Sequence, residues 1–111
     1  MRVLTKLEEN VLLTILKLKD DAYIVSIKDQ LEHITRKNMS FGALYVALNR
    51  LIKYRYLESY IGESSSLRGG RAKKYYKLTK KGVLALKDIR QLQNQMWKGF
   101  DNLTKEWLEG Q

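Results

Sequence analysis

Apolar residues recur every three or four positions through the first half of the chain, which is the spacing of amphipathic α-helices. The pattern predicts helices over residues 6–18, 22–35 and 41–54. Their apolar positions are Leu7, Val11, Ile15 and Leu18, then Ile24, Ile27, Leu31 and Ile34, and then Leu44, Leu48, Leu51 and Ile52. Thr5 and Ser40 each precede one of these segments and favour the N-cap position. Three short helices with one apolar face each predict a small shared core.

Two later segments, residues 56–61 and 74–79, alternate between opposite sides as strands do. In the first, Leu57, Ser59 and Ile61 fall on one side and Tyr56, Glu58 and Tyr60 on the other. The stretch between the segments is polar and contains Gly69-Gly70, so a hairpin with a flexible tip is expected. Three helices followed by a hairpin is the element order of a winged helix-turn-helix. The predicted fold class is therefore mainly α with a small β-hairpin, the third helix serving as recognition helix.

A third apolar pattern follows Thr79 and predicts one helix over residues 80–108, about 43 Å long at about 1.5 Å per residue. Its stripe consists of Ile89, Leu92, Met96, Phe100, Leu103 and Trp107. Such a helix extends beyond a domain of this size, so the stripe needs a second chain, most simply in a two-fold dimer. Gly99 weakens the helix and can mark a kink or a close approach. We expect a winged-helix domain over 1–80 and a dimerisation helix over 81–111.

Positive charge is concentrated in one segment. The formal net charge is +9, and residues 67–81 contain seven Lys/Arg and no Asp/Glu. Residues 1–66 contain ten basic and eight acidic residues, and residues 82–111 contain four of each. This concentration predicts an anionic partner, and nucleic acid leads because Lys and Arg contacts to phosphates release counterions. The alternative is a solvated charged loop.

The composition excludes several classes of protein. With 44% hydrophobic and 30% charged residues, the chain reads as soluble and globular. It has no Cys and one His, so disulfides and zinc sites are not expected, and no cofactor is predicted. His33 lies near Asp29 and Glu32, but no nucleophile or phosphate loop accompanies it, so no enzyme is predicted. No apolar run approaches the roughly 20 residues that cross a bilayer, so we expect a cytoplasmic protein without a membrane partner.

The third helix has the composition of a helix that enters the major groove of DNA, with small residues first and polar residues off the apolar stripe. The expected DNA contacts are Ser40, Gly42, Ala43, Tyr45, Asn49, Arg50 and Lys53. Ser40 and the free amides of the first turn can hold a phosphate, Tyr45 can donate a hydrogen bond, and Asn49 can read a base. The simpler alternative makes Ser40 only a cap and Tyr45 only a packing residue.

The basic segment supplies the expected contacts of the wing. They are Arg68, Gly70, Arg71, Lys73, Lys74, Tyr75 and Lys77. The glycine pair lets the backbone approach the sugar-phosphate surface, and the cations face phosphates. Arg68 or Arg71 at the tip can also enter a narrow minor groove. Tyr76 and Leu78 are expected to pack beneath the wing, which leaves Tyr75 as the more solvent-directed ring.

In combination, these segments resemble the PadR family of bacterial transcriptional regulators. The motifs that carry the resemblance are SFGALY from Ser40 to Tyr45, Asn49-Arg50-Leu51, and GGRAKKYYKLTKKG from Gly69 to Gly82. The resemblance covers about residues 4–86. It implies a winged helix that binds operator DNA as a dimer, usually to repress. The single C-terminal helix is similar to the compact branch of the family.

The resemblance also implies an effector site. Compact members can bind flat aromatic compounds at the dimer interface, between C-terminal helices that contribute a Trp. Met96, Trp97 and Phe100 are the candidate pocket residues, although Gln93 stands at the position that aligns with that Trp. Plain packing is the alternative role for these side chains. The expected function is a sequence-specific homodimeric repressor released by a small aromatic effector; the alternative is a protein-interaction module whose basic wing binds an acidic protein surface.

Overall fold

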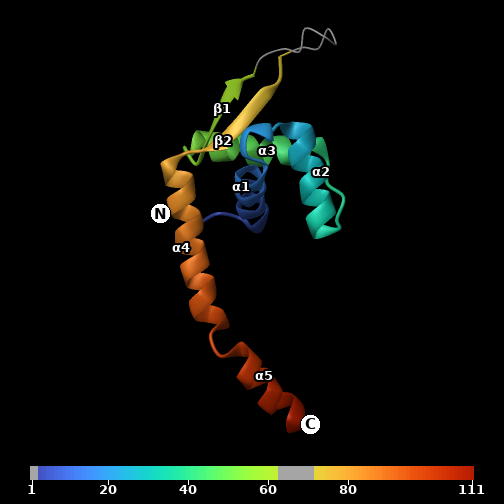
Figure 1. Ribbon diagram of the computed structural model, residues 1–111, viewed down its shortest axis with the longest axis vertical. Helices are drawn as coiled ribbons and strands as arrows, with labels where there is room; N and C mark the ends of the chain where they lie inside the picture. The colour runs from blue at the N-terminus through green and yellow to red at the C-terminus, as the bar shows by residue number, and fades with distance from the viewer. Residues whose placement is uncertain (1–2, 63–71) are drawn as a thin grey trace.

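The chain folds as three helices, a two-stranded hairpin and two further helices, as Figure 1 shows for this computed structural model. The structure describes residues 3–62 and 72–111. Its elements are α1 (Lys6–Leu18), the 3-10 turn η1 (Lys19–Asp21), α2 (Ile24–Thr35), α3 (Phe41–Lys53), β1 (Leu57–Ile61), β2 (Lys74–Leu78), α4 (Lys80–Trp97) and α5 (Phe100–Glu109). The predicted fold class, mainly helical with a small antiparallel hairpin, is confirmed.

The predicted helix starts rest on side-chain caps. The Thr5 hydroxyl accepts a hydrogen bond from the Glu8 amide at 3.1 Å, and the Glu8 carboxylate accepts one from the Thr5 amide at 2.8 Å. The Ser40 and Thr79 hydroxyls cap α3 and α4 in the same way, each accepting from an amide three residues later. These bonds satisfy amides that have no partner inside a helix.

Helix α2 begins two residues later than its apolar spacing predicts. Ala22 and Tyr23 are extended, and the Ala22 carbonyl accepts a hydrogen bond from the Tyr76 amide at 2.8 Å. Tyr23 also forms an isolated antiparallel bridge with Tyr75. The entry to α2 therefore pairs with the wing across about fifty residues of sequence, which local periodicity does not reveal.

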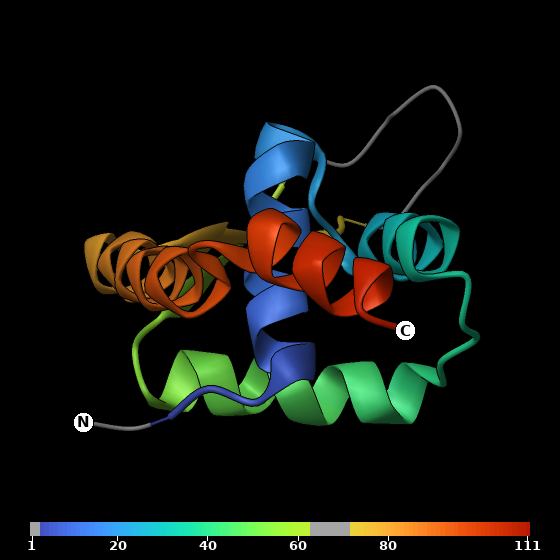
Figure 2. The ribbon, with the colours of Figure 1, turned by 90° about the horizontal axis from the view of Figure 1, so that it is seen from below.

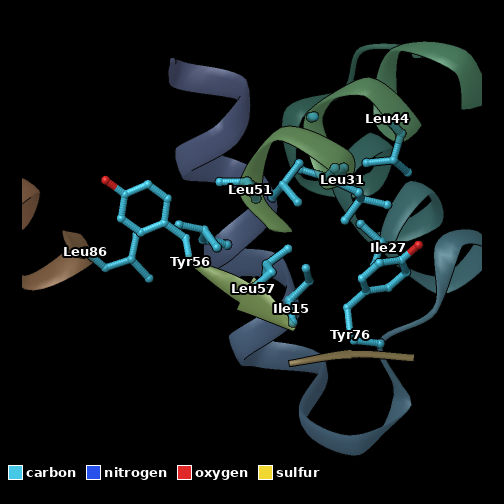
Figure 3. Close-up of a cluster of buried hydrophobic side chains, with 14 residues drawn as sticks. Ile15, Ile27, Leu31, Leu44, Leu51, Tyr56, Leu57, Tyr76 and Leu86 are labelled. Atoms are coloured by element: carbon cyan, nitrogen blue, oxygen red, sulfur yellow. The ribbon is translucent and has the colours of Figure 1, made fainter. Parts of the chain in front are cut away.

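The core joins every element of the winged helix. Its buried members are Val11, Leu12, Ile15, Ala22, Ile27, Leu31, Leu44, Ala47, Leu48, Leu51, Tyr56, Leu57, Tyr76 and Leu86. Figure 3 shows Tyr76 of β2 and Leu57 of β1 in the same cluster as Ile15 of α1. The predicted packing of Tyr76 beneath the wing is confirmed, with Leu78 partly buried against it. Ile61, placed on the same strand side as Leu57 by alternation, is exposed because it lies beyond the core.

A tight corner joins α3, β1 and α4. Arg55 has a left-handed φ of 66°, and Tyr56 follows it before β1 begins, so Tyr56 and Leu57 are both buried. The Thr79 hydroxyl donates to the Arg55 carbonyl at 2.6 Å, and the Thr79 amide donates to the Tyr56 carbonyl at 3.1 Å. A Cβ at Gly82 would lie only 2.2 Å from that Tyr56 carbonyl oxygen. The start of α4 is thus fixed to the end of the recognition helix.

The expectation of one unbroken helix over 80–108 is wrong. Helix α4 ends at Trp97, Lys98 leaves the helical conformation in a turn with φ −58° and ψ 128°, and Gly99 adopts a left-handed φ of 81° before α5 begins. Glycine takes this conformation without a Cβ clash, and it is a common terminator just past a helix end. Figure 1 shows α4 and α5 extending away from the winged helix along the 65 Å longest dimension. None of the helices within residues 3–62 and 72–111 is long and apolar enough to cross a bilayer.

Candidate nucleic-acid interface

Helix α3 has one buried and one exposed face. The buried face consists of Leu44, Ala47, Leu48 and Leu51, and the residues on the opposite, exposed arc are Gly42, Tyr45, Val46, Asn49 and Lys53. At 3.6 residues per turn the exposed set spans an arc of roughly 100°. Figure 2 shows α3 along the lower edge of the view, with α4 and α5 crossing its middle. The exposed face, hereafter the outer face of α3, is therefore available to a ligand.

The first turn of α3 carries the small residues that the sequence placed against DNA. Ser40 is exposed, and its hydroxyl accepts a hydrogen bond from the Ala43 amide at 3.0 Å. Around Gly42, a Cβ would meet only the Ser40 hydroxyl oxygen, 3.9 Å away. Gly42 is therefore not required by the fold. Its missing side chain leaves room for close approach by a ligand at this end of the helix.

Arg50 does not lie on the outer face. Its Nε is 3.5 Å from a carboxylate oxygen of Glu8, whose side chain is only 3% exposed. The position of Arg50 at the edge of α3 turns its guanidinium toward α1, where the Glu8 carboxylate also caps the start of that helix. The structure thus gives Arg50 a role in packing α1 against α3, which the sequence did not reveal.

A carboxylate fixes the turn between α2 and α3. Glu32 accepts a hydrogen bond from the Met39 amide at 2.8 Å and pairs with Lys28 at 3.1 Å. The Met39 amide, followed by Lys28, lowers the pKa of the Glu32 carboxyl below its usual value. Lys28 also lies 5.1 Å from the ring centre of Phe41, the first residue of α3. These contacts hold the recognition helix in place relative to α2.

The wing strands pair antiparallel, with Tyr60 opposite Tyr75 and Glu58 opposite Lys77. As expected, Tyr75 is more exposed than Tyr76, but it is still partly buried because two other rings contact it. It stacks on Tyr60 at 5.6 Å and meets Tyr23 edge to face at 5.8 Å. The spacing of tyrosines in the sequence gave no sign of this cluster, since Tyr23 comes from the entry to α2.

The described wing lysines are exposed and lie against aromatic rings or a carboxylate. Lys73 lies 4.2 Å from the ring centre of Tyr23, and Lys74 lies 5.7 Å from that of Tyr76. Lys77 lies 3.4 Å from Glu58, with both side chains more than half exposed. Such a pair is weak in water, so the ammonium group can exchange partners readily. Arg68, Gly70 and Arg71 lie outside the described residues.

The predicted dimer stripe is exposed along α4 and α5. Leu92, Met96, Phe100, Leu103 and Trp107 are exposed, and Ile89 is partly buried. At the start of the stripe, α4, the beginning of α1 and the residues just before it enclose a groove of about 740 Å³, whose apolar lining includes Val3, Leu4, Leu84 and the stripe residue Leu92. An exposed apolar surface of this extent is unusual for a monomer.

Of the three candidate effector residues, two share one hollow. Trp97 and Phe100 meet edge to face at 4.8 Å and line a hollow of about 480 Å³ with Gly99, Asp101 and Asn102. Met96 is exposed but does not line it. The Trp97 indole nitrogen donates to the Gln93 side-chain oxygen at 3.1 Å.

An exposed recognition helix, set on a helix-turn-helix and followed by a lysine-bearing hairpin, defines the winged-helix class of DNA-binding proteins. Residues 3–88 match the model of the transcriptional regulator PadR-like family, and the chain belongs to that family. It is a DNA-binding transcriptional regulator and not an enzyme.

Solved structures agree with this assignment. A PadR-like transcriptional regulator from Bacillus cereus strain ATCC 14579 is 27% identical, covering 95% of this chain and 93% of its own, with a TM-score of 0.68. A PadR-like transcription factor from Bacteroides fragilis is 28% identical, covering 87% of this chain and 88% of its own, with a TM-score of 0.68. A PadR family regulator from Clostridium difficile R20291 is 28% identical over 91% and 97%, with a TM-score of 0.58. No curated protein matches.

Proposed function

We propose that this regulator is a homodimeric repressor that reads a roughly palindromic operator with α3. The observation that carries the proposal is the outer face of α3, which is exposed and presents Tyr45, Asn49 and Lys53 while the opposite face of the same helix fills the core. A helix that presents such a face can enter the major groove, where each base pair has a distinct pattern of donors and acceptors.

The residues divide by role. The sugar-phosphate backbone of DNA is contacted at the start of α3, by Ser40, Gly42, Ala43 and Tyr45. Further along the helix, Asn49 faces the bases, with Lys53 beside it. The wing contributes phosphate contacts from Lys73, Lys74 and Lys77, and from Arg68, Gly70 and Arg71 of its tip. Arg50 and Tyr75 act indirectly, because Arg50 turns toward Glu8 and Tyr75 holds the wing.

A second copy of the chain is the proposed partner for the stripe Ile89, Leu92, Met96, Phe100, Leu103 and Trp107. Its exposed leucine, methionine and aromatic side chains favour burial against a matching surface. A two-fold dimer would place two recognition helices about 34 Å apart, one turn of DNA. Repression follows if the operator overlaps a promoter.

Selection of bound DNA from a random pool tests the proposal. We expect an inverted repeat to be enriched, with an affinity that falls steeply with salt at a slope of about −0.9 per phosphate contacted. Lys73→Ala with Lys74→Ala should reduce that slope, whereas Lys105→Ala on α5 should leave it unchanged. No enriched sequence, or DNA affinity independent of salt, would contradict the proposal and favour an acidic protein surface as the partner of the wing.

The dimer has its own test, analytical ultracentrifugation of the full chain. Leu92→Glu places a charge in the stripe and should convert dimers to monomers, with a parallel loss of operator affinity. Leu16→Glu is the matched control, since Leu16 is also an exposed leucine but lies on α1, outside the stripe. A wild-type monomer would refute the dimer.

We also propose that a small flat aromatic compound binds at Met96, Trp97 and Phe100 and releases the repressor. Trp107→Phe leaves Trp97 as the only tryptophan and so makes its fluorescence a reporter. Planar aromatic compounds should quench that fluorescence and weaken operator binding in parallel. Quenching without an effect on operator binding would remove the regulatory role and leave only a binding site.

A further inference from the structure

Val46 lies on the outer face of α3, and its role is not explained by the fold. Its side chain is 60% exposed, whereas Leu44, Ala47 and Leu48 around it in sequence are buried. It stands one turn after Gly42 and about one turn before Asn49. Val46 is therefore an apolar side chain on the surface that we propose faces the bases.

Valine is a poor choice for this position on structural grounds alone. A β-branched residue loses χ1 freedom in a helix, and its helix propensity is lower than that of Ala, Lys or Glu. Single exposed apolar residues are common on protein surfaces, so exposure by itself assigns nothing. The position is the informative part, because Val46 shares a narrow arc with Gly42 and Asn49 rather than lying at the core boundary.

The chemistry of the major groove supplies a matching ligand. Among the base edges in that groove, only thymine presents a methyl group, on C5. Val46 offers two methyl groups, and the absent side chain at Gly42 lets this part of the helix come close. Asn49 is three residues further along, about 4.5 Å of helix rise, which is close to the roughly 3.4 Å spacing of base pairs.

We infer that Val46 is a specificity-determining residue that contacts the C5-methyl group of a thymine in each operator half-site. This inference rests on the proposed function, because it requires α3 to lie in the major groove. A contact between methyl groups removes apolar surface from water without needing a donor or acceptor. It therefore discriminates thymine from cytosine and from any base without that methyl.

The test replaces thymine with deoxyuridine, which differs only by the missing methyl. In the selected operator, each thymine is replaced in turn, symmetrically in both half-sites, and dissociation constants are measured by fluorescence anisotropy. We expect one position at which the replacement weakens wild-type binding by roughly three- to tenfold per half-site, the range for losing one buried methyl contact. With Val46→Ala, which removes both γ-methyl groups, the same replacement should have a clearly smaller effect.

Val25→Ala is the matched control, because Val25 is also an exposed valine but lies on α2. It should keep the full deoxyuridine effect. Thermal melts check that Val46→Ala folds, which its exposure leads us to expect. An operator at which no thymine methyl matters, or an effect that persists unchanged in Val46→Ala, overturns the inference while leaving the proposed function intact. Failure to find any operator overturns both.

Discussion

The ring of Tyr75 lies directly over Gly62, so that a Cβ at Gly62 would fall 2.3 Å from Cε2 of the ring. The Gly62 amide donates to the Lys73 carbonyl at 2.8 Å, which continues the strand ladder at this point. Tyr75 in turn stacks on Tyr60 and contacts Tyr23. The glycine thus makes room for the ring that connects the wing to the entry of α2.

Gly62→Ala should therefore displace the Tyr75 ring and loosen the wing. We expect a loss of stability of about 1–3 kcal/mol, the usual range for overpacking, together with weaker DNA binding. Urea denaturation measures the first effect and anisotropy the second. In a Tyr75→Ala background, Gly62→Ala should lower the free energy of unfolding only slightly, because the ring that the new Cβ would meet is absent. Equal losses in both backgrounds would contradict the role given to the ring.

Gly82→Ala should be more damaging than other glycine substitutions in the described chain. The new Cβ would press on the Tyr56 carbonyl oxygen, a backbone atom held by the Thr79 amide. We expect a loss of about 3 kcal/mol or more in urea denaturation, because backbone cannot rotate away as a side chain can. Gly110→Ala is the control, because the nearest atom to a Cβ at Gly110 would be 3.4 Å away, so the loss of stability should be small.

Gly42→Ala should separate folding from DNA binding. The site is open, so replacing glycine in a helix should raise stability by up to about 1 kcal/mol. The same methyl group would stand between α3 and DNA, and we expect operator affinity to fall by about 1–3 kcal/mol. Thermal melts and anisotropy on one protein preparation measure both. A variant that is more stable and binds DNA as tightly as the wild type would show that α3 does not approach closely at Gly42.

Arg50 and Lys53 should differ in what their removal affects. Arg50→Ala leaves the buried Glu8 carboxylate without its cation, and we expect a stability loss of about 1–3 kcal/mol. Lys53→Ala removes an exposed charge on the outer face, so it should leave the melting temperature nearly unchanged and weaken DNA binding. A large effect of Arg50→Ala on DNA affinity at full stability would restore Arg50 to the DNA contacts.

The pKa of Glu32 makes the turn before α3 sensitive to acid. Because the Met39 amide and Lys28 lower this pKa in the folded state, the ionised carboxylate stabilises the fold at pH values above the ordinary value of 4.5. That contribution is lost as the pH falls through the lowered pKa. The stability difference between wild type and Glu32→Gln should therefore shrink between pH 6 and about pH 3. Glu58→Gln, which removes one partner of an exposed ion pair, is the control and should change the stability little.

Much of this fold could be predicted from local patterns. The starts of α1, α3 and α4 each depend on a hydrogen bond between a side-chain hydroxyl and a backbone amide three residues later, so both partners are close together in the sequence. The alternation around Tyr76 likewise reveals the buried side of β2. The outer face of α3 follows from the apolar stripe on its inner face, because helix geometry places one opposite the other.

The remaining features depend on residues that only the tertiary structure brings together. The Tyr23, Tyr60 and Tyr75 cluster joins three separate segments, and the Arg50 pair with Glu8 spans two helices. The sequence marked Gly99 as a site for a kink, but it did not predict that the helix ends there, because a glycine permits a left-handed φ without requiring it. Spacing along the chain was enough to predict the three helices of the winged-helix domain, their apolar faces and the segment where positive charge gathers. Tertiary packing sets which basic side chains pair with a carboxylate, as Arg50 does with Glu8, and which aromatic rings pack together at the wing. These outcomes depend on contacts between segments that are distant in the sequence.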